Sequence, residues 1–224
     1  MMVSILEIIG PAMIGPSSSH TLGAMRISKF AYNLNGGVPE SVTFYLHGSF
    51  QDTYIGHGTW LALLAGMCGL KTDDVEVAKA DKVAKKLGLK YDFKPIDLGE
   101  VHPNTVKIST LKNGVRHEVI GSSIGAGRVK IISIDSIECE LDGEYPTLIV
   151  ENQDVPGALE SIISTLSFHG INIATMQLKR ESKYLHRASA MIELDSSISL
   201  DILNQIKKLD VVNSALYVNA IMEE

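Results

Sequence analysis

The chain has 224 residues, of which 45% are apolar and 21% charged, and its net charge is −6. This is the composition of a globular protein long enough for two modest domains. Because no cluster of Lys and Arg offsets the acidic charge, the composition argues against nucleic acid or an anionic membrane as a main partner.

No apolar run approaches the roughly 20 residues that are needed to cross a bilayer. Residues 1–9 are apolar but lack a basic leader and a small-residue cleavage pattern, so we interpret them as a first strand or helix, not a signal peptide. These features predict a cytoplasmic protein. The two cysteines, Cys68 and Cys139, are expected to be buried free thiols, because a disulfide is unusual in that compartment. An iron–sulfur cluster usually requires about four thiolates, more than this chain has.

A polar motif stands near the N-terminus, where Gly15-Pro16 is followed by Ser17-Ser18-Ser19-His20-Thr21. Gly-Pro interrupts any preceding element, and residues 22–34 then have the pattern of an amphipathic helix. The start of a helix offers unpaired amides to a carboxylate or phosphate, and the neutral pKa of His suits proton transfer. The alternative is a Ser-rich cap ahead of a packing helix.

The rest of the first domain alternates predicted elements with short polar segments. Alternating β-forming residues predict strands, and Asn113-Gly114 is a strong hairpin signal. Apolar periodicity and capping residues predict helices. The predicted strands cover residues 41–46, 105–109, 116–122 and 128–134, and the predicted helices cover residues 60–70 and 75–87.

Four polar clusters fall at the ends of these elements, and each joins His to Gly, Ser, Thr or Asn, as a pocket for a small polar substrate needs. They are Ser17–Thr21, His47-Gly48-Ser49, Gly56-His57-Gly58-Thr59 and His102-Pro103-Asn104. A Ser–His hydrolase is disfavoured because the chain has no Gly-x-Ser-x-Gly elbow. A zinc site from the four clusters is disfavoured because the spacing of their histidines matches no known zinc pattern. The other histidines, His117, His169 and His186, are expected to be structural.

The acidic, turn-rich segment 138–144 predicts a domain boundary, with one domain over residues 1–140 and another over residues 145–224. The second domain is predicted as strand, helix, strand, strand, helix, strand, which is the ferredoxin-like βαββαβ plan. We therefore expect an α/β (α+β) protein whose first domain is mixed α/β. Asp154 is expected to cap the first helix of the second domain, and Asn172 to lie near that helix end, although turn chemistry alone also explains both residues.

The motifs of the two domains resemble those of known protein families. Asp154-x-Pro156-Gly157 with Asn172-Ile173 resembles an ACT domain, an amino-acid-sensing module of metabolic enzymes. The Gly15–Thr21 motif resembles the signature of the β subunit of bacterial iron–sulfur L-serine dehydratase, and the other three clusters are similar to that family in the same order. The first domain also resembles the allosteric substrate-binding domain of some phosphoglycerate dehydrogenases, which leaves a purely regulatory amino-acid-binding subunit as the alternative.

The dehydratase resemblance implies a two-chain enzyme that converts L-serine to pyruvate and ammonia without pyridoxal phosphate. It implies a 4Fe–4S cluster on the α chain, acting as Lewis acid on the substrate hydroxyl, and no metal on this chain. We expect homodimerisation through the ACT or the first domain. Our hypothesis makes His20 the acid/base and Ser17, Ser18, Ser19 and Thr21 the carboxylate anchors, with His47, Ser49, His57, His102 and Asn104 completing the pocket. The ACT resemblance implies an amino-acid site at Asp154, Pro156, Gly157, Asn172 and Ile173.

Overall fold

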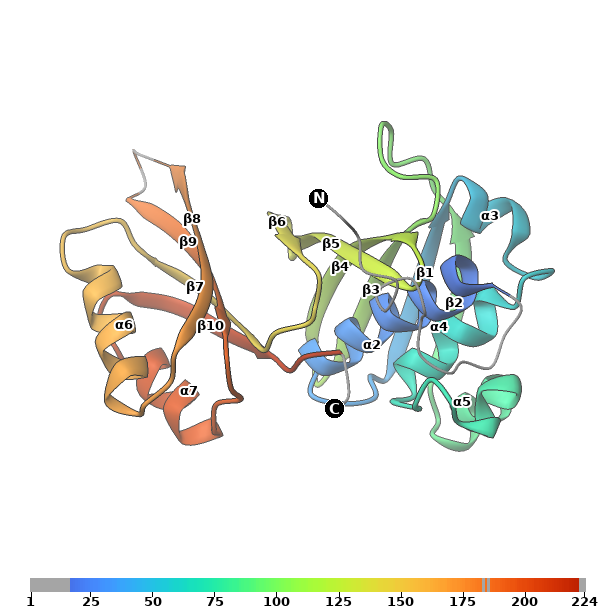
Figure 1. The fold of residues 1–224 in the computed structure, drawn as a ribbon, viewed down its shortest axis with the longest axis horizontal. Helices are drawn as coiled ribbons and strands as arrows, with labels where there is room; N and C mark the ends of the chain where they lie inside the picture. The colour runs from blue at the N-terminus through green and yellow to red at the C-terminus, as the bar shows by residue number, and fades with distance from the viewer. Residues whose placement is uncertain (1–16, 183, 185, 222–224) are drawn as a thin grey trace. The chain divides into compact units, whose positions relative to one another are not determined.

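The computed structural model describes residues 17–182, 184 and 186–221. The chain divides after Asp142 into two compact units, and each unit contains one β-sheet with its own helices (Figure 1). The predicted α/β (α+β) class is therefore confirmed. The element expected over residues 1–9 and the Gly15-Pro16 break lie outside the described residues.

The first unit is built on a six-stranded sheet in the order β2-β1-β3-β4-β5-β6. Strands β1 and β2 are parallel, and the other neighbouring strands are antiparallel. The predicted hairpin is confirmed, because Asn113 and Gly114 have the positive φ angles (51° and 77°) that a tight two-residue turn requires. The strands are β1 (Ser41–His47), β2 (Lys90–Pro95), β3 (Thr105–Lys112), β4 (Val115–Gly125), β5 (Arg128–Ile134) and β6 (Ile137–Leu141).

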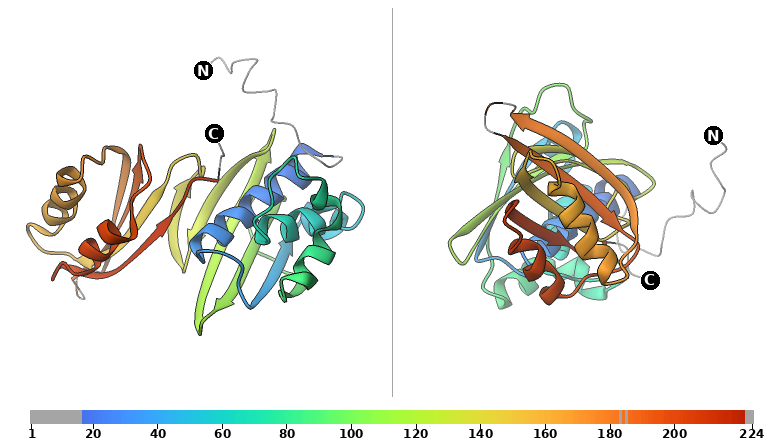
Figure 2. Two further views of the ribbon diagram at one scale, coloured as in Figure 1. Left: turned by 90° about the horizontal axis from the view of Figure 1, so that it is seen from below. Right: turned by 90° about the vertical axis from the view of Figure 1, so that its left-hand side faces the viewer.

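Helices α2 and α4 lie on the same side of this sheet (Figure 2). Helix α2 packs on β3, β4 and β5, and α4 packs against α2. The two helices approach closely because Gly66 has no side chain: a Cβ there would lie 2.2 Å from the Met25 carbonyl oxygen. The helical elements are the π-helical turn η1 (Ser18–Gly23), α2 (Ala24–Leu34), α3 (Ser49–Thr53), α4 (Thr59–Met67), the 3₁₀ turn η2 (Val75–Lys79) and α5 (Ala80–Lys86).

The division after Asp142 lies within the predicted boundary segment 138–144, but residues 138–141 belong to strand β6 and not to a turn. Glu138 and Glu140 are exposed and alternate with buried Cys139 and Leu141, so the acidic residues form one face of an edge strand. Strand β2 and helix α3 were also not expected. Strand β2 is the opposite edge of the sheet and is mostly exposed: Tyr91 and Phe93 alternate with charged residues, but neither side chain is fully buried.

The second unit has the predicted βαββαβ order. Its sheet runs β10-β7-β9-β8, all neighbouring strands are antiparallel, and both helices cover one face, which is the ferredoxin-like plan (Figure 1). The elements are β7 (Thr147–Gln153), α6 (Ala158–Phe168), β8 (Ile173–Ser182), β9 (Arg187–Leu194), α7 (Leu200–Lys207) and β10 (Val212–Val218). None of the helices in the described part of the chain is long and apolar enough to span a membrane.

Candidate active site

His20 lies in the π-helical turn that leads into α2. Ser17 begins this turn as its N-cap, since its Oγ accepts a hydrogen bond from the His20 backbone N–H at 3.2 Å. Gly23, at the end of the turn, lies directly against β4, because a Cβ at Gly23 would be only 2.0 Å from Ser123 Oγ. Single π-helical turns of this kind are rare and occur often at functional sites.

The His20 ring is held by polar and aromatic contacts. Its Nε2 lies 2.9 Å from Ser49 Oγ, and its Nδ1 lies 3.5 Å from Ser17 Oγ. The rings of Phe50 and His57 pack edge-on against it at centroid distances of 5.6 and 4.7 Å. Burial lowers the pKa of His20 from its ordinary 6.5, and the neighbouring His57 lowers it further. His20 is therefore neutral at pH 7 and able to accept a proton.

The third polar cluster joins the first at the start of α4. The Thr21 hydroxyl, which is buried, donates a hydrogen bond to the His57 carbonyl oxygen at 3.3 Å. His57 itself is exposed. Gly58 follows it with a φ of 69°, a left-handed conformation that glycine adopts readily and that lets α4 begin immediately.

The second and fourth clusters meet where Gly48 approaches Pro103. Gly48 has a φ of 55°, and a Cβ there would lie 2.8 Å from the Pro103 carbonyl oxygen. The Phe50 N–H donates a hydrogen bond to the same oxygen, at an N···O distance of 3.4 Å. His102 is exposed, and its Nδ1 accepts a hydrogen bond from the Asn104 N–H at 3.1 Å.

The structure thus brings all four clusters into one continuous set of contacts, centred on His20. Their hydroxyls are not equally available. Those of Ser17 and Thr21 are engaged with His20 and His57. Ser18 is exposed and Ser19 half-buried, and neither side chain has a hydrogen-bond partner among the residues that the structure describes. Ser18 and Ser19 are therefore the hydroxyls of this motif that remain open to a ligand.

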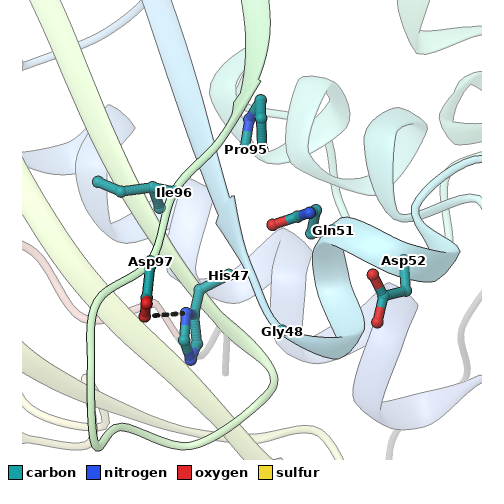
Figure 3. Close-up of a pocket in the computed structure, with 7 residues that line it drawn as sticks. All are labelled: His47, Gly48, Gln51, Asp52, Pro95, Ile96 and Asp97. Carbon is teal, nitrogen blue, oxygen red and sulfur yellow. Dashed lines mark ion pairs between the residues drawn. The ribbon is translucent and has the colours of Figure 1, made fainter.

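A cavity of about 420 Å³ opens beside His47 (Figure 3). It forms at the carboxyl ends of the parallel strands β1 and β2, where ligands commonly bind in α/β proteins. His47 and Asp97 lie on one side of it, and Gln51 and Asp52 reach it from α3 (Figure 3). Sequence reasoning missed Gln51, Asp52 and Asp97, because neither helix α3 nor strand β2 had been recognised. The lining residues are His47, Gly48, Gln51, Asp52, Pro95, Ile96 and Asp97.

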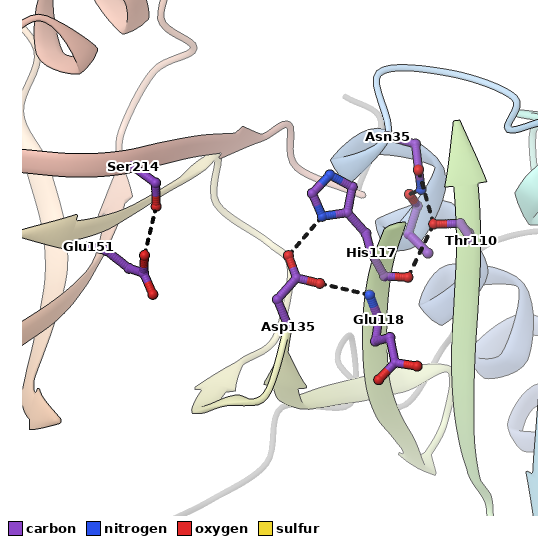
Figure 4. A network of polar contacts seen from close by, with 8 residues as sticks. Asn35, Thr110, His117, Glu118, Asp135, Glu151 and Ser214 are labelled. Atoms are coloured by element: carbon purple, nitrogen blue, oxygen red, sulfur yellow. Dashed lines mark hydrogen bonds and ion pairs between the residues drawn. The ribbon is translucent and has the colours of Figure 1, made fainter. Parts of the chain in front are cut away.

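His117 has a structural environment, as expected from the sequence. Its Nδ1 lies 2.7 Å from Asp135 Oδ2, and the other carboxylate oxygen accepts the Glu118 N–H at 2.7 Å (Figure 4). Asp135 and Ser136 have positive φ angles of 48° and 70° in the turn between β5 and β6. The Asp135 contacts hold this turn in a conformation that non-glycine residues rarely adopt.

A second cavity, of about 170 Å³, lies at the start of α6 in the second unit. Helix α6 begins after Gly157 without a side-chain cap, so the expected capping role of Asp154 is wrong. The Asp154 carboxylate instead forms an ion pair with both the Nε and an Nη of Arg180 from β8. Asn152, at 2% exposure, also lines the cavity, and its Oδ1 has no partner within the described residues. Sequence reasoning missed Asn152, although it lies on the same face of β7 as Leu148 and Val150, which belong to the core.

Asn172 and Ile173 do not reach this cavity within one chain. Ile173 pairs with Leu194, whereas Gln153, beside Asp154, pairs with Arg187 at the opposite end of β9. At about 3.3 Å per residue, the two ends are roughly 20 Å apart. The expectation that Asn172 lies near the start of α6 is therefore wrong, because β8 begins beside the C-terminal end of that helix.

The motifs and their arrangement agree with the comparisons to known proteins. A family model described as "Serine dehydratase beta chain" matches residues 4–94. The chain is 37% identical over 207 residues to the probable L-serine dehydratase, beta chain, of Bacillus subtilis, covering 92% of this chain and 93% of the relative. It is also 37% identical over 217 residues to the L-serine dehydratase, beta chain, of Peptoniphilus asaccharolyticus, covering 96% and 97%. The chain belongs to the L-serine dehydratase β-chain family.

A third relative contains a segment similar to part of this chain within a longer protein. The L-serine dehydratase of Streptomyces coelicolor is 40% identical over 86 residues, which cover 36% of this chain and 19% of that protein. A segment like the one in this β-chain family therefore occurs there within a longer L-serine dehydratase.

The thiols of this chain do not fit the iron–sulfur cluster that the family resemblance implies. Cys68 ends α4 and Cys139 lies in β6, and both are buried. Burial raises the pKa of Cys68 to about 11 and that of Cys139 to about 12, so both remain protonated. Cluster ligation requires thiolates. In residues 17–182, 184 and 186–221, no three His, Cys, Asp or Glu side chains are grouped as metal ligands.

Proposed function

We propose that this chain is the β subunit of a two-chain L-serine ammonia-lyase, in which it contributes half of the active site. The observation that carries the proposal is the convergence of four polar clusters on His20. The relatives support it, because two of them are named as beta chains of L-serine dehydratase and a beta chain implies an α-chain partner. The Streptomyces relative supports a shared enzyme, because a similar segment is part of one longer L-serine dehydratase.

The reaction removes the Cα proton and the β-hydroxyl of L-serine, and the resulting enamine tautomerises and hydrolyses to pyruvate and ammonia. His20 is the proposed acid/base, because its lowered pKa keeps the ring unprotonated at pH 7. Ser17 and Ser49 orient the ring through its two nitrogens. The hydroxyls of Ser18 and Ser19, at the open start of the helical segment, anchor the substrate carboxylate.

The remaining residues of the site form its rim in this proposal. His57 lies against the His20 ring, and Thr21 fixes the position of the His57 backbone. His102 and Asn104 stabilise the loop that contacts Gly48. The 4Fe–4S cluster, which supplies Lewis acidity toward the substrate hydroxyl, is assigned to the α chain. This assignment is supported by the two buried, protonated thiols of the present chain.

We further propose that residues 143–224 form an ACT module that binds an amino acid at the start of α6. The uncapped helix amides suit a carboxylate, and the unpartnered Asn152 Oδ1 suits an ammonium group. Asp154 joins the site only if Arg180 releases it. Because Asn172 and Ile173 lie at the far end of the sheet, a site that uses both sets requires a second copy of the chain, which supports homodimerisation.

The test is His20→Ala in the enzyme reconstituted with an α chain. Removing an acid/base group should lower kcat on the order of 10²–10⁴-fold. His169→Ala is the matched control, because the His169 ring contacts Gln205 and Phe168 in the second unit, and its loss should leave kcat unchanged. A near-normal rate for His20→Ala, with the control also active, would remove His20 from the mechanism.

A further inference from the structure

The neutral ring of His47 has a hydrogen-bond donor at Nε2, because its other nitrogen, Nδ1, accepts a hydrogen bond. Its Nδ1 accepts a hydrogen bond from the backbone N–H of Leu98 at 3.2 Å. A backbone amide donates and cannot accept through its N–H, so Nδ1 carries no proton. In the neutral ring the proton must therefore be on Nε2. The loop after β2 thus selects one tautomer of a histidine at the end of β1.

The Nε2–H of His47 lacks an acceptor within the part of the chain that the structure describes. The side chain is 14% exposed and lines the cavity, so Nε2 is reached by water or by a ligand that enters there. A ligand that accepts a hydrogen bond can take the place of this water. His47 lines the 420 Å³ cavity, and the chain runs from it through Gly48 to Ser49, which contacts His20.

The charges around His47 complement an α-amino acid. Asp97 Oδ1 lies 3.9 Å from His47 Nδ1, and Asp52 lines the cavity on the side of α3 (Figure 3). No Lys or Arg is among the lining residues. Two carboxylates and one N–H donor suit a molecule that carries both an ammonium and a carboxylate group, whereas a simple anion would be repelled by the two aspartates.

We propose that His47, in addition to the hydroxyls of Ser18 and Ser19, binds the carboxylate of the substrate amino acid through its fixed Nε2–H and takes no part in proton transfer. The inference rests on the proposed function, in which the first unit binds L-serine. It assigns different roles to two histidines of the same site. His20 exchanges protons, and His47 sets the affinity for the substrate.

Three variants of the reconstituted enzyme test this role: His47→Ala, His47→Gln and His47→Asn. A glutamine amide offers an N–H near the position of Nε2, whereas the shorter asparagine reaches only the position of Nδ1. Losing a donor to a charged group should raise the KM for L-serine roughly 10- to 100-fold in His47→Ala. His47→Gln should recover most of this loss and His47→Asn little of it, while kcat and its pH dependence stay unchanged in all three.

Two kinetic results would overturn the proposal. If all three variants lose kcat at least about 100-fold and one limb of the pH profile disappears, His47 transfers protons. If KM stays constant but more α chain is needed for half-maximal activity, the donor binds the α chain and not the substrate.

The tautomer is tested separately on the isolated chain by ¹⁵N NMR of the histidine rings. His47→Ala assigns the signals, and near pH 8, where histidine is neutral, we expect a protonated Nε2 and an unprotonated Nδ1. A protonated Nδ1 overturns the inference whatever the enzyme does. A wild-type complex that does not turn over L-serine would count against the proposed function instead, and the NMR result would still decide the tautomer.

Discussion

Replacing Gly23 by Ala should destabilise the first unit at the turn that carries His20. A Cβ at Gly23 would lie 2.0 Å from Ser123 Oγ and 2.6 Å from Ser123 Cβ. A change of rotamer moves Oγ but not Cβ, and carbon atoms normally stay about 3.5–4.0 Å apart, so the backbone must shift by about 1 Å. Overpacking of this kind costs about 1–3 kcal/mol, and the higher helix propensity of Ala returns up to about 1 kcal/mol. We expect a net loss of about 1–2 kcal/mol in the free energy of unfolding.

Urea unfolding followed by Trp60 fluorescence measures this loss. Trp60 is the only tryptophan of the chain and lies in α4, so its signal reports on the first unit. With a slope of about 2 kcal/mol per molar urea, the midpoint should fall by about 0.5–1 M.

Gly56→Ala is the matched control, because the nearest atom to its added Cβ would be Thr53 O at 3.9 Å. It should change stability by less than about 0.5 kcal/mol. Adding Ser123→Gly to Gly23→Ala removes both overlapping atoms and should restore most of the lost stability. If Gly23→Ala is as stable as Gly56→Ala, or if Ser123→Gly restores nothing, the close approach does not constrain the turn.

Three further predictions concern charge and ionisation. His57→Gln should raise the pKa of His20 toward its ordinary value in an NMR titration, because a neighbouring positive charge is removed while burial remains. Cys68 and Cys139 should react slowly with an alkylating reagent at about pH 8 in the native chain and rapidly in urea, because burial keeps the thiols protonated. Changing both cysteines to Ser should leave the iron content of the two-chain complex unchanged. Arg180→Gln should alter the free energy of unfolding by less than about 1 kcal/mol, because the ion pair is partly exposed, and should tighten amino-acid binding at α6 measured by calorimetry.

Each of these predictions has an opposing result. An unchanged or lower pKa of His20 in His57→Gln would mean that the two rings do not interact electrostatically. Loss of iron on changing both cysteines would mean that this chain supplies a cluster ligand. An unchanged affinity in Arg180→Gln would mean that Asp154 is not a ligand-binding group.

The lowered pKa of His20 also gives the stability of the first unit a pH dependence. The folded state binds the His20 proton less readily than the unfolded state, in which the pKa is near its ordinary 6.5. This group therefore lowers the free energy of unfolding as the pH falls below about 6.5. Urea titrations should show the loss in the wild type and less of it in His57→Gln. An equal loss in both proteins would assign the pH dependence to other groups.

The fold could be predicted wherever one face of an element is buried. Strand β1 alternates buried and half-buried residues, and Asn113-Gly114 fixes the hairpin turn, so both were found. The edge strands β2 and β6 were missed because polar residues occupy most of their exposed positions. An alternating pattern was present in β6, but its two glutamates gave it the composition of a turn.

The residues of the candidate site could be predicted from the sequence, but the contacts between them could not. The four polar clusters stand out because polar residues follow apolar elements, yet the contact of His20 with Ser49 depends on how β1 is placed relative to η1. The environment of Asp154 was misjudged for the same reason. A carboxylate before a helix normally caps it, but here Arg180, brought close by β8, forms a stronger charged contact.

The most direct test of the central claim is anaerobic co-expression of this chain with a candidate α chain, followed by an assay of pyruvate formed from L-serine. The account predicts pyruvate only when both chains are present, with the iron of the complex remaining on the α chain after the two are separated. An iron-loaded α chain that turns over L-serine equally well alone would contradict the claim that this chain supplies half of the active site.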